Sequence, residues 1–186
     1  MKGMNSWAIG GIATALVVVL GILVMYLWNP YHTASRDPRA RVFGSVVYVN
    51  TSDNMYPTLE RGGPFIVDAK AFMSHGPQPR ELVAYFAPPD GKDLLIGRVI
   101  ALGGSTVEMR NGTVFVDGVE VHEPYVAAPA DGETGTVLAL RKLERDTCFV
   151  LGDNRAHSKD SRDFGAVNSD RLIGRVLTMN FGTRKQ

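Results

Sequence analysis

The most regular hydrophobic pattern in the chain is an apolar run close to its start. Residues 7–28 carry no charge, and from Ala13 onward they are rich in valine, leucine and isoleucine. At about 1.5 Å per residue the run forms a helix of about 33 Å, enough for a hydrocarbon core of about 30 Å. Trp7 at one end and Tyr26 and Trp28 at the other suit the two interfaces of a bilayer. The pattern predicts a transmembrane helix over 7–28, preceded by a short tail at 1–6.

A cleaved secretory signal is the competing interpretation of this run. Its apolar part is longer than such signals usually have, and Lys2 is the only charged side chain before it. Thr33-Ala34-Ser35 offers a small-residue cleavage site, so this alternative stays open. Asn29-Pro30 is expected to end the helix, because proline disfavours the helical conformation of the residue before it.

The rest of the chain has the pattern of short strands. Residues 29–41 are polar and contain two prolines, which predicts a linker. From Val42 onward, β-branched and aromatic residues gather in short segments between turn signals, and Asn111-Gly112 is typical of a two-residue hairpin turn. Residues 42–186 are therefore predicted to form a mostly β, barrel-like or sandwich body. The predicted strands are 42–49, 65–68, 81–86, 94–102, 106–109, 113–116, 119–121, 147–151 and 171–181.

Composition narrows the possible functions. Charged residues are 21% and the formal net charge is +1, which gives no argument for nucleic acid. Cys148 is the single cysteine, so no intrachain disulfide can form, and its apolar neighbours predict a buried thiol. The histidines lack the spacing of metal ligands, and the glycine pairs read as turns rather than as a phosphate loop. No metal and no cofactor are expected.

Two distant segments carry the candidate chemistry. Residues 52–59 read Ser-Asp-Asn-Met-Tyr-Pro-Thr-Leu, and residues 152–165 read Gly-Asp-Asn-Arg-Ala-His-Ser-Lys-Asp-Ser-Arg-Asp-Phe-Gly. Both resemble boxes of the type I signal peptidases, which are membrane-anchored serine proteases with a Ser/Lys dyad. Residues 97–104 resemble a third box of that family in degraded form. The resemblance covers about residues 42–181 and implies an antiparallel, barrel-like β body, with a loop-rich insertion expected over 126–142.

The resemblance breaks at the two catalytic positions. Asn54 stands where the family has its serine nucleophile, and Gly97 stands where it has its lysine base. An amide is not a useful nucleophile toward a peptide carbonyl, and glycine has no side chain, so the resemblance implies lost catalysis. Gly97 is also expected to leave open the space of the lysine stem. Ser52 matches the oxyanion-hole serine, and Ser158 matches a serine near the base.

Other matched residues imply support for the site. Met55 and Pro57 match the wall of the family's peptide groove. Asp160 and Arg162 are expected to form a buried pair that orients a loop more than it adds stability. The remaining two positions of this group, Asp153 and Arg155, are expected to hold the same loop.

Three functions remain after this reading. We expect an inactive homologue that acts as a peptide-binding or assembly factor, with signal peptides or extended segments of exported proteins as partners. An active signal peptidase is the first alternative, and a structural membrane subunit with a closed groove is the second. The alternative enzyme would use Ser52, or another serine with a base such as Lys70, Lys159 or His157.

The charge pattern and the family resemblance predict opposite orientations of the body in the membrane. Arg36, Arg39 and Arg41 follow the apolar run and are offset only by Asp37, so the positive-inside rule would keep the body in the cytoplasm. The signal peptidase resemblance implies an extracytoplasmic body. We expect a single-pass membrane protein with the second orientation, because the matched motifs are specific and the charge difference is small.

Overall fold

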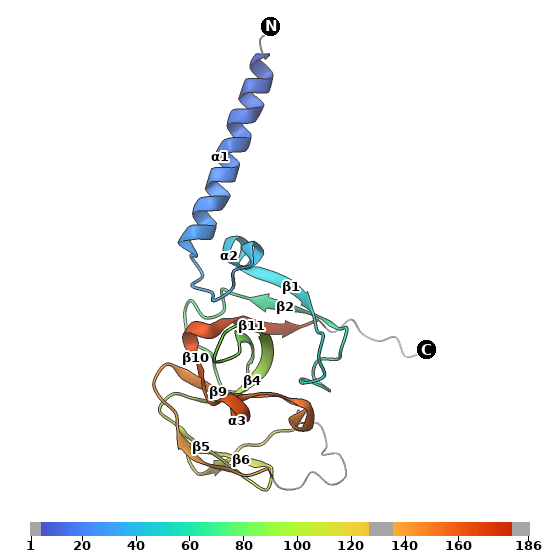
Figure 1. The fold of residues 1–186 in the computed structure, drawn as a ribbon, viewed down its shortest axis with the longest axis vertical. Helices are drawn as coiled ribbons and strands as arrows, with labels where there is room; N and C mark the ends of the chain where they lie inside the picture. Colours follow the sequence, from blue (N-terminus) through green and yellow to red (C-terminus); the bar gives the residue numbers. More distant parts are fainter. Residues whose placement is uncertain (1–4, 127–135, 180–186) are drawn as a thin grey trace, which may run out of the picture.

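A computed structural model describes residues 5–126 and 136–179. Helix α1 (Ser6–Trp28) projects from the body as a separate rod (Figure 1). Its segment Gly10–Trp28 is long and apolar enough to cross a membrane, and none of it is buried by the body. The helix ends at Asn29, which adopts a left-handed conformation (φ 48°) and donates its N–H to Met25 O at 3.1 Å. The predicted N-terminal apolar helix is confirmed.

The segment after α1 differs from the predicted linker. Helix α2 (Pro38–Phe43) lies within it and runs into the start of the predicted strand, so strand β1 begins only at Ser45. Asp37 caps α2 by accepting from Arg39 N, and the Arg39 guanidinium holds the pKa of Asp37 below its usual value. The segment is packed rather than free, because Ala40 is fully buried in the core.

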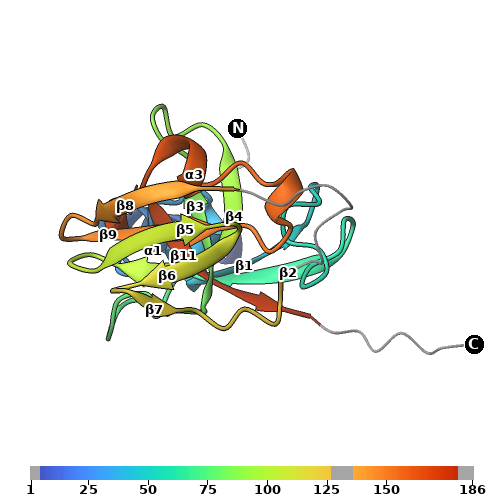
Figure 2. The same ribbon diagram turned by 90° about the horizontal axis from the view of Figure 1, so that it is seen from below.

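Seven antiparallel strands form the main sheet. Their order is β1-β2-β11-β3-β4-β9-β10. Strand β11, the last described strand in the sequence, therefore lies between β2 and β3. The sheet curls around the body, as the views in Figures 1 and 2 show. Its strands are β1 (Ser45–Val49), β2 (Pro64–Asp68), β3 (Leu82–Phe86), β4 (Leu94–Leu102), β9 (Thr147–Leu151), β10 (Val167–Asn168) and β11 (Leu172–Thr178).

A smaller sheet of four strands has the order β7-β6-β5-β8 and lies at the end of the body away from α1 (Figure 1). The predicted hairpin at Asn111-Gly112 is confirmed: both residues have positive φ (50° and 83°), as a tight hairpin turn requires. The strands are β5 (Thr106–Arg110), β6 (Thr113–Val116), β7 (Val119–Glu120) and β8 (Leu138–Lys142). Strand β8 belongs to the predicted insertion, most of which lies outside the described residues.

Short helical elements complete the body: η1 (Arg155–His157), α3 (Ser161–Phe164) and η2 (Ser169–Arg171). The core lies on both faces of the main sheet, so β3 and β4 are apolar almost throughout. Cys148 is fully buried on β9, and burial raises the pKa of its thiol to about 12. The predicted mostly β, antiparallel fold with one N-terminal apolar helix is confirmed.

Candidate functional site

The loop after β1 is held by a buried asparagine that the sequence analysis missed. Asn50 is 3% exposed, and its Nδ2 donates to Ser52 O, Leu59 O and Glu60 O at 2.8–3.2 Å. One amide thus ties both ends of the loop that carries the first box. The sequence signal that could have indicated its role is the position of this polar residue, between a predicted strand and the first box.

Asn54 is buried at the centre of the site. Its Nδ2 donates to Ile96 O at 2.6 Å, and its Oδ1 accepts from Ser52 Oγ. Both ends of the carboxamide are therefore bonded. The first bond connects the loop to strand β4 beside Gly97, so the two positions that the resemblance matched to the dyad lie close together.

The space beside Gly97 is filled. A Cβ built on Gly97 would overlap Val150 Cγ1 and would lie 3.4 Å from Tyr85 Cε1. The expectation of an open space for a lysine stem was therefore wrong. The reason is the neighbouring strand β9, whose Val150 packs against the bare backbone of Gly97.

The second box reaches Asn54 through Gly152. A Cβ on Gly152 would overlap the side chain of Ser158 and would lie 2.7 Å from Asn54 O, so only glycine permits this approach. Asn154 N donates to Asn54 O at 3.0 Å. Ser158 Oγ is buried and has no hydrogen-bond partner among the described residues. The fold thus brings Asn54, Gly97 and Ser158 to one place.

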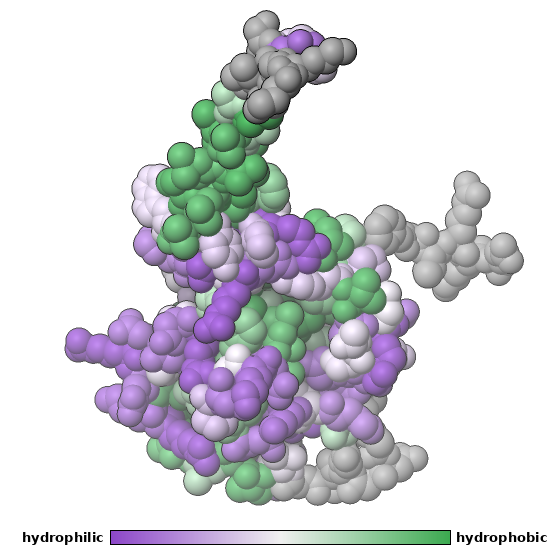
Figure 3. Space-filling model, turned by 45° about the horizontal axis from the view of Figure 1, so that its top comes forward, coloured by the Kyte–Doolittle hydropathy of each residue, from purple (hydrophilic) through white to green (hydrophobic). Residues whose placement is uncertain are grey.

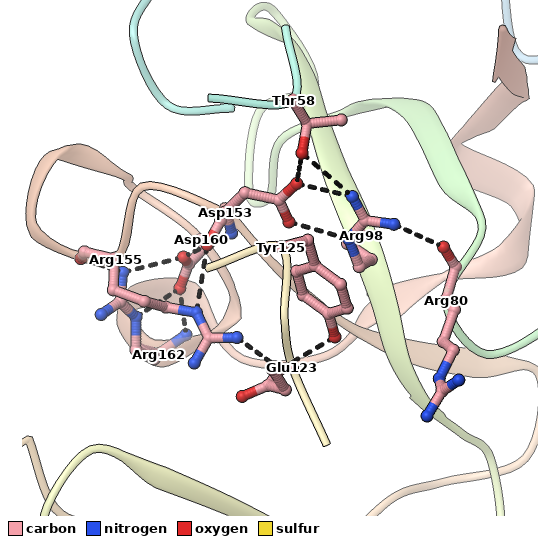
Figure 4. A network of polar contacts seen from close by, with 10 residues as sticks. Thr58, Arg80, Arg98, Glu123, Tyr125, Asp153, Arg155, Asp160 and Arg162 are labelled. Atoms are coloured by element: carbon pink, nitrogen blue, oxygen red, sulfur yellow. Dashed lines mark hydrogen bonds and ion pairs between the residues drawn. The ribbon is translucent and has the colours of Figure 1, made fainter. Parts of the chain in front are cut away.

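A buried ion pair supports the loops around this place (Figure 4). Arg98 binds Asp153 through two bonds, from Nε at 2.8 Å and from Nη2 at 2.6 Å. Thr58 Oγ1 donates to the same carboxylate at 2.5 Å. The Arg98 guanidinium also lies 3.8 Å from the centroid of the Tyr125 ring. Asp153, on the second box, is therefore held by Arg98 on β4.

Arg155 has a different partner. Its Nη2 binds Glu123 Oε1 at 2.5 Å, and Tyr125 Oη donates to the same oxygen at 3.0 Å (Figure 4). Burial and the Glu123 carboxylate both raise the pKa of Tyr125, so its hydroxyl stays protonated and keeps donating. The segment that carries Glu123 and Tyr125 is thereby fixed to the second box.

Asp160 and Arg162 form the ion pair expected from the sequence. Arg162 Nε lies 2.8 Å from Asp160 Oδ1, and Nη2 lies 2.9 Å from Oδ2. Asp160 is 1% exposed, caps α3 and accepts from Gly152 N at 3.0 Å. One carboxylate therefore holds both the short helix and the glycine that touches Ser158.

The two residues matched to the groove wall, Met55 and Pro57, differ in burial. Met55 is fully buried in the core, and Pro57 is exposed in the turn that follows. Neither is among the described residues that line the cavity beside the site. For Met55, the sequence pattern could not separate a core contact from a groove contact, because both require an apolar residue.

A groove lies between the end of β1 and the start of β4. It encloses a cavity of about 450 Å³, lined by residues 48–52, residues 92–96 and Phe65. Val49 and Leu94 are 58% and 38% exposed, so the walls of the groove are partly apolar.

The backbone edge of β4 is open along this groove. Ala87 N donates to Asp93 O, so the backbone of Asp93 faces β3. Because ladder bonds alternate along a strand, the backbone groups of Leu94 and Ile96 face away from β3. Strand β9 covers that edge only from Arg98 onward. No strand in the described part of the chain pairs with this edge between residues 94 and 96, where Asn54 Nδ2 alone bonds to Ile96 O.

Strand β1 offers a second open edge. It is the last strand on its side of the sheet as described, and Asn50 N donates inward to Gly63 O. The same alternation directs the backbone groups of Val49 and Thr51 outward. Four successive antiparallel pairings separate β1 from β4, so the two edges run in the same direction.

Known proteins resemble this chain over most of its length. The family model described as "Signal peptidase, peptidase S26" matches residues 6–181. A probable signal peptidase I-1 of Synechocystis sp. is 37% identical over 134 residues, covering 68% of this chain and 66% of the relative. Signal peptidase I of Bacillus caldolyticus is 33% identical over 147 residues, covering 73% of this chain and 79% of the relative.

A crystal structure of a signal peptidase I from Enterococcus faecalis V583 is also similar, with 33% identity and a TM-score of 0.48 over 56% of this chain and 98% of that chain. This chain spans less than two thirds of the length of two Synechocystis relatives: 66% of the probable signal peptidase I-1 and 58% of a probable signal peptidase I-2. The family match extends from the start of α1 to beyond the end of β11, and the chain therefore belongs to the signal peptidase family, peptidase S26.

Proposed function

We propose that this chain is a membrane-anchored member of the family that lacks peptidase activity and binds extended peptide segments of exported proteins. Asn54 and Gly97 stand at the positions of the nucleophile and the base. Helix α1 anchors the body in the bilayer, and the body lies on the extracytoplasmic side, where exported segments emerge.

The bonding of the Asn54 carboxamide is the observation that carries this proposal. The oxygen and the nitrogen of the amide are both hydrogen-bonded, so the side chain connects the loop that carries Ser52 to strand β4. Among the described residues, Ser52 Oγ meets only the amide oxygens of Asn50 and Asn54. A serine nucleophile needs a base that takes its proton at neutral pH, and an amide oxygen does not serve as one.

The groove supports the binding part of the proposal. Because β1 and β4 run in the same direction, an extended peptide between them would have the same orientation relative to both edges. It would hydrogen-bond to both, which is peptide recognition by strand addition. Its side chains would meet Val49 and Leu94, which favours small or apolar residues. Asn54 already occupies Ile96 O, so pairing along β4 is expected to centre on Leu94 and to end at Ile96.

An active signal peptidase remains the alternative function. It would use Ser52 as the nucleophile, because this hydroxyl borders the groove. Such an enzyme would require a base brought by a partner or by a rearranged loop. Cleavage that disappears in Ser52→Ala would favour this function.

Peptide titration tests the binding proposal. A labelled peptide from the C-terminal part of a signal peptide is titrated against the full chain in detergent. The pair Val49→Asp and Leu94→Asp is expected to abolish binding, because it places charges on both groove walls. Val119→Asp is the matched control: Val119 is 70% exposed on the distant strand β7, and its replacement should leave binding unchanged.

Two outcomes would contradict the binding proposal. The first is that the native protein fails to bind the peptide, which would favour a structural subunit with a closed groove. The second is equal binding by the groove variant and the β7 variant, which would place the peptide on another surface.

A further inference from the structure

We propose that Arg36, Arg41 and Lys70, at the base of α1, form a binding site for the phosphate groups of anionic phospholipids. We call these three side chains the basic collar. The inference rests on α1 spanning the bilayer, as proposed above, and it is independent of the peptide groove. Hydrophilic surface gathers directly below the hydrophobic helix α1 (Figure 3).

Arg41 has the best-defined position in the collar. Its guanidinium lies 5.0 Å from the centroid of the Tyr26 ring, in the last turn of α1, and its Nε donates to Ser35 O at 2.7 Å. Its two Nη groups have no acceptor within the described part of the chain. Tyrosine rings at the end of a membrane span lie at headgroup level, so the guanidinium lies at the depth of the phosphates. Its planar fork suits a phosphate group.

The other two cations converge on the same end of α1. Tyr26 Oη donates to Arg36 O at 3.3 Å, which brings the backbone of the exposed Arg36 to the helix. Lys70 comes from the turn after β2, and its stem crosses Gly44 at the end of α2. Lys70 Nζ lies 5.7 Å from the centroid of the Tyr31 ring. Helix α2 packs against α1, and the three residues contact Tyr26 or Tyr31 at or just beyond the end of α1.

The collar keeps its positive charge. Arg39 does not belong to it, because Asp37 binds its guanidinium at 2.7 Å. No ion pair joins a collar residue to a carboxylate among the residues that the structure describes. Asp68 is the adjacent carboxylate, and it accepts from the backbone N–H of Lys70. The collar with Asp68 is net positive, and in the adjoining hollow Lys92 and Arg171 offset the carboxylates of Asp90 and Asp170.

A hollow large enough for a headgroup adjoins the collar. Its cavity of about 620 Å³ is lined by Arg36 together with Lys92 and Arg171, and by the carboxylates of Asp90 and Asp170. The Asp90 carboxylate lies 3.5 Å from Lys92 Nζ. The mixed charge of this hollow suits a headgroup that carries hydroxyl or amine groups beside its phosphate.

The two tryptophans of the chain provide the test. Trp28 lies at the collar end of α1, and Trp7 lies at the opposite end. The full chain with Trp7→Phe is reconstituted in phosphatidylcholine vesicles that contain brominated phosphatidylglycerol or brominated phosphatidylcholine. Bromine quenches a nearby indole, so the quenching of Trp28 reports which lipid resides at the collar. The Trp28→Phe chain reports the other interface through Trp7.

We expect stronger quenching of Trp28 by phosphatidylglycerol than by phosphatidylcholine, and no such preference at Trp7. Each basic side chain near an anionic surface contributes roughly fivefold in binding. Arg41→Gln with Lys70→Gln should therefore remove most of the preference. Arg141→Gln with Lys142→Gln is the matched control, because it makes the same charge change on the remote strand β8 and should leave the preference intact.

Three results would overturn the assignment. Equal quenching of Trp28 by both lipids would remove the lipid preference. An equal loss of preference in the β8 variant would show that the preference depends on the net charge of the protein and not on the collar. Displacement of the lipid by millimolar inorganic phosphate would mark the collar as a site for the free ion.

Discussion

The carboxamide of Asn54 contributes two hydrogen bonds that a serine in its place could not make together. Its amide nitrogen reaches Ile96 O while its oxygen holds Ser52 Oγ, so one side chain connects the loop, the oxyanion-hole match and β4. Asn54→Ser would lose the bond to β4 without gaining a base. The single variant is expected to show no turnover in a signal-peptide cleavage assay.

Restoring a lysine at Gly97 is expected to fail for a steric reason. Its Cβ would overlap Val150 Cγ1, so Gly97→Lys should destabilise the fold by about 1–3 kcal/mol, as overpacking does. Val150→Ala should destabilise the native protein by leaving a cavity, yet stabilise the Gly97→Lys protein by making room.

Urea unfolding of the native protein, the two single variants and the double variant measures the effect of Val150→Ala on the free energy of unfolding. This effect is expected to change sign when lysine is present at position 97. When Asn54→Ser is added to each of these four proteins, weak cleavage is expected only in the triple variant N54S/G97K/V150A. In that variant alone the new serine has a base and the lysine stem has room. If Val150→Ala destabilises both backgrounds equally, the lysine stem would not lie against Val150.

The Asp160–Arg162 pair should have a measurable effect on stability. Asp160 is 1% exposed, so Arg162→Ala leaves a buried carboxylate without its partner and should cost roughly 3–5 kcal/mol of unfolding free energy. Arg110→Ala is the control. Arg110 pairs with Glu108 at the surface, where such pairs contribute about 0–1 kcal/mol. Equal losses in the two variants would show that the Asp160 site is solvated.

At the scale of elements, the segment between α1 and β1 behaves as part of the body. Thr33 Oγ1 donates to Ile173 O at 2.7 Å, and Ala34 N donates to Leu172 O at 3.2 Å, so the segment is tied to β11. A body that begins at Val42 loses both bonds and the buried Ala40. It should be less stable than a body that begins at Pro30 by about 2 kcal/mol or more, since each bond contributes about 1 kcal/mol.

Thermal unfolding of the two truncated bodies checks this prediction. Equal melting temperatures would mean that residues 30–41 are a linker after all, as their polarity and prolines suggested. A lower melting temperature for the shorter body would assign these residues to the folded unit.

The strands could be predicted from sequence where local rules decide them. The hairpin at Asn111-Gly112 follows from turn chemistry, and β4 follows from a continuous apolar run between turn signals. Helix α2 was missed although Asp37-Pro38 is a helix-start signal, because its six residues are too few to show a periodic apolar pattern. The cap begins the helix, and burial of Ala40 in the core stabilises it.

The site was predictable in position but not in its contacts. Matched boxes indicated that Asn54, Gly97 and Ser158 belong together, and the fold places them together. The partners of Asp153 and Arg155 could not be predicted, because Arg98 and Glu123 are distant from them in sequence and near only in space. The filled space beside Gly97 depends on Val150 of another strand, which no local pattern reports.

At the scale of the whole molecule, the charges at the base of α1 bear on orientation. The positive-inside rule favours a cytoplasmic body, and the proposed extracytoplasmic body places the basic collar on the opposite side. Lipid binding by the collar would give these charges a role on that side. Protease protection of the body in sealed membrane vesicles distinguishes the two orientations.

The central claim is that this member of the signal peptidase family does not cleave peptides. The direct measurement is turnover of a preprotein by the full chain in membrane vesicles, with Ser52→Ala and protein-free vesicles as controls. We expect the native chain to match both controls, because Ser52 Oγ has only amide oxygens as partners among the described residues and the space beside Gly97 is filled. Cleavage at the signal-peptide junction that is lost in Ser52→Ala would contradict the account.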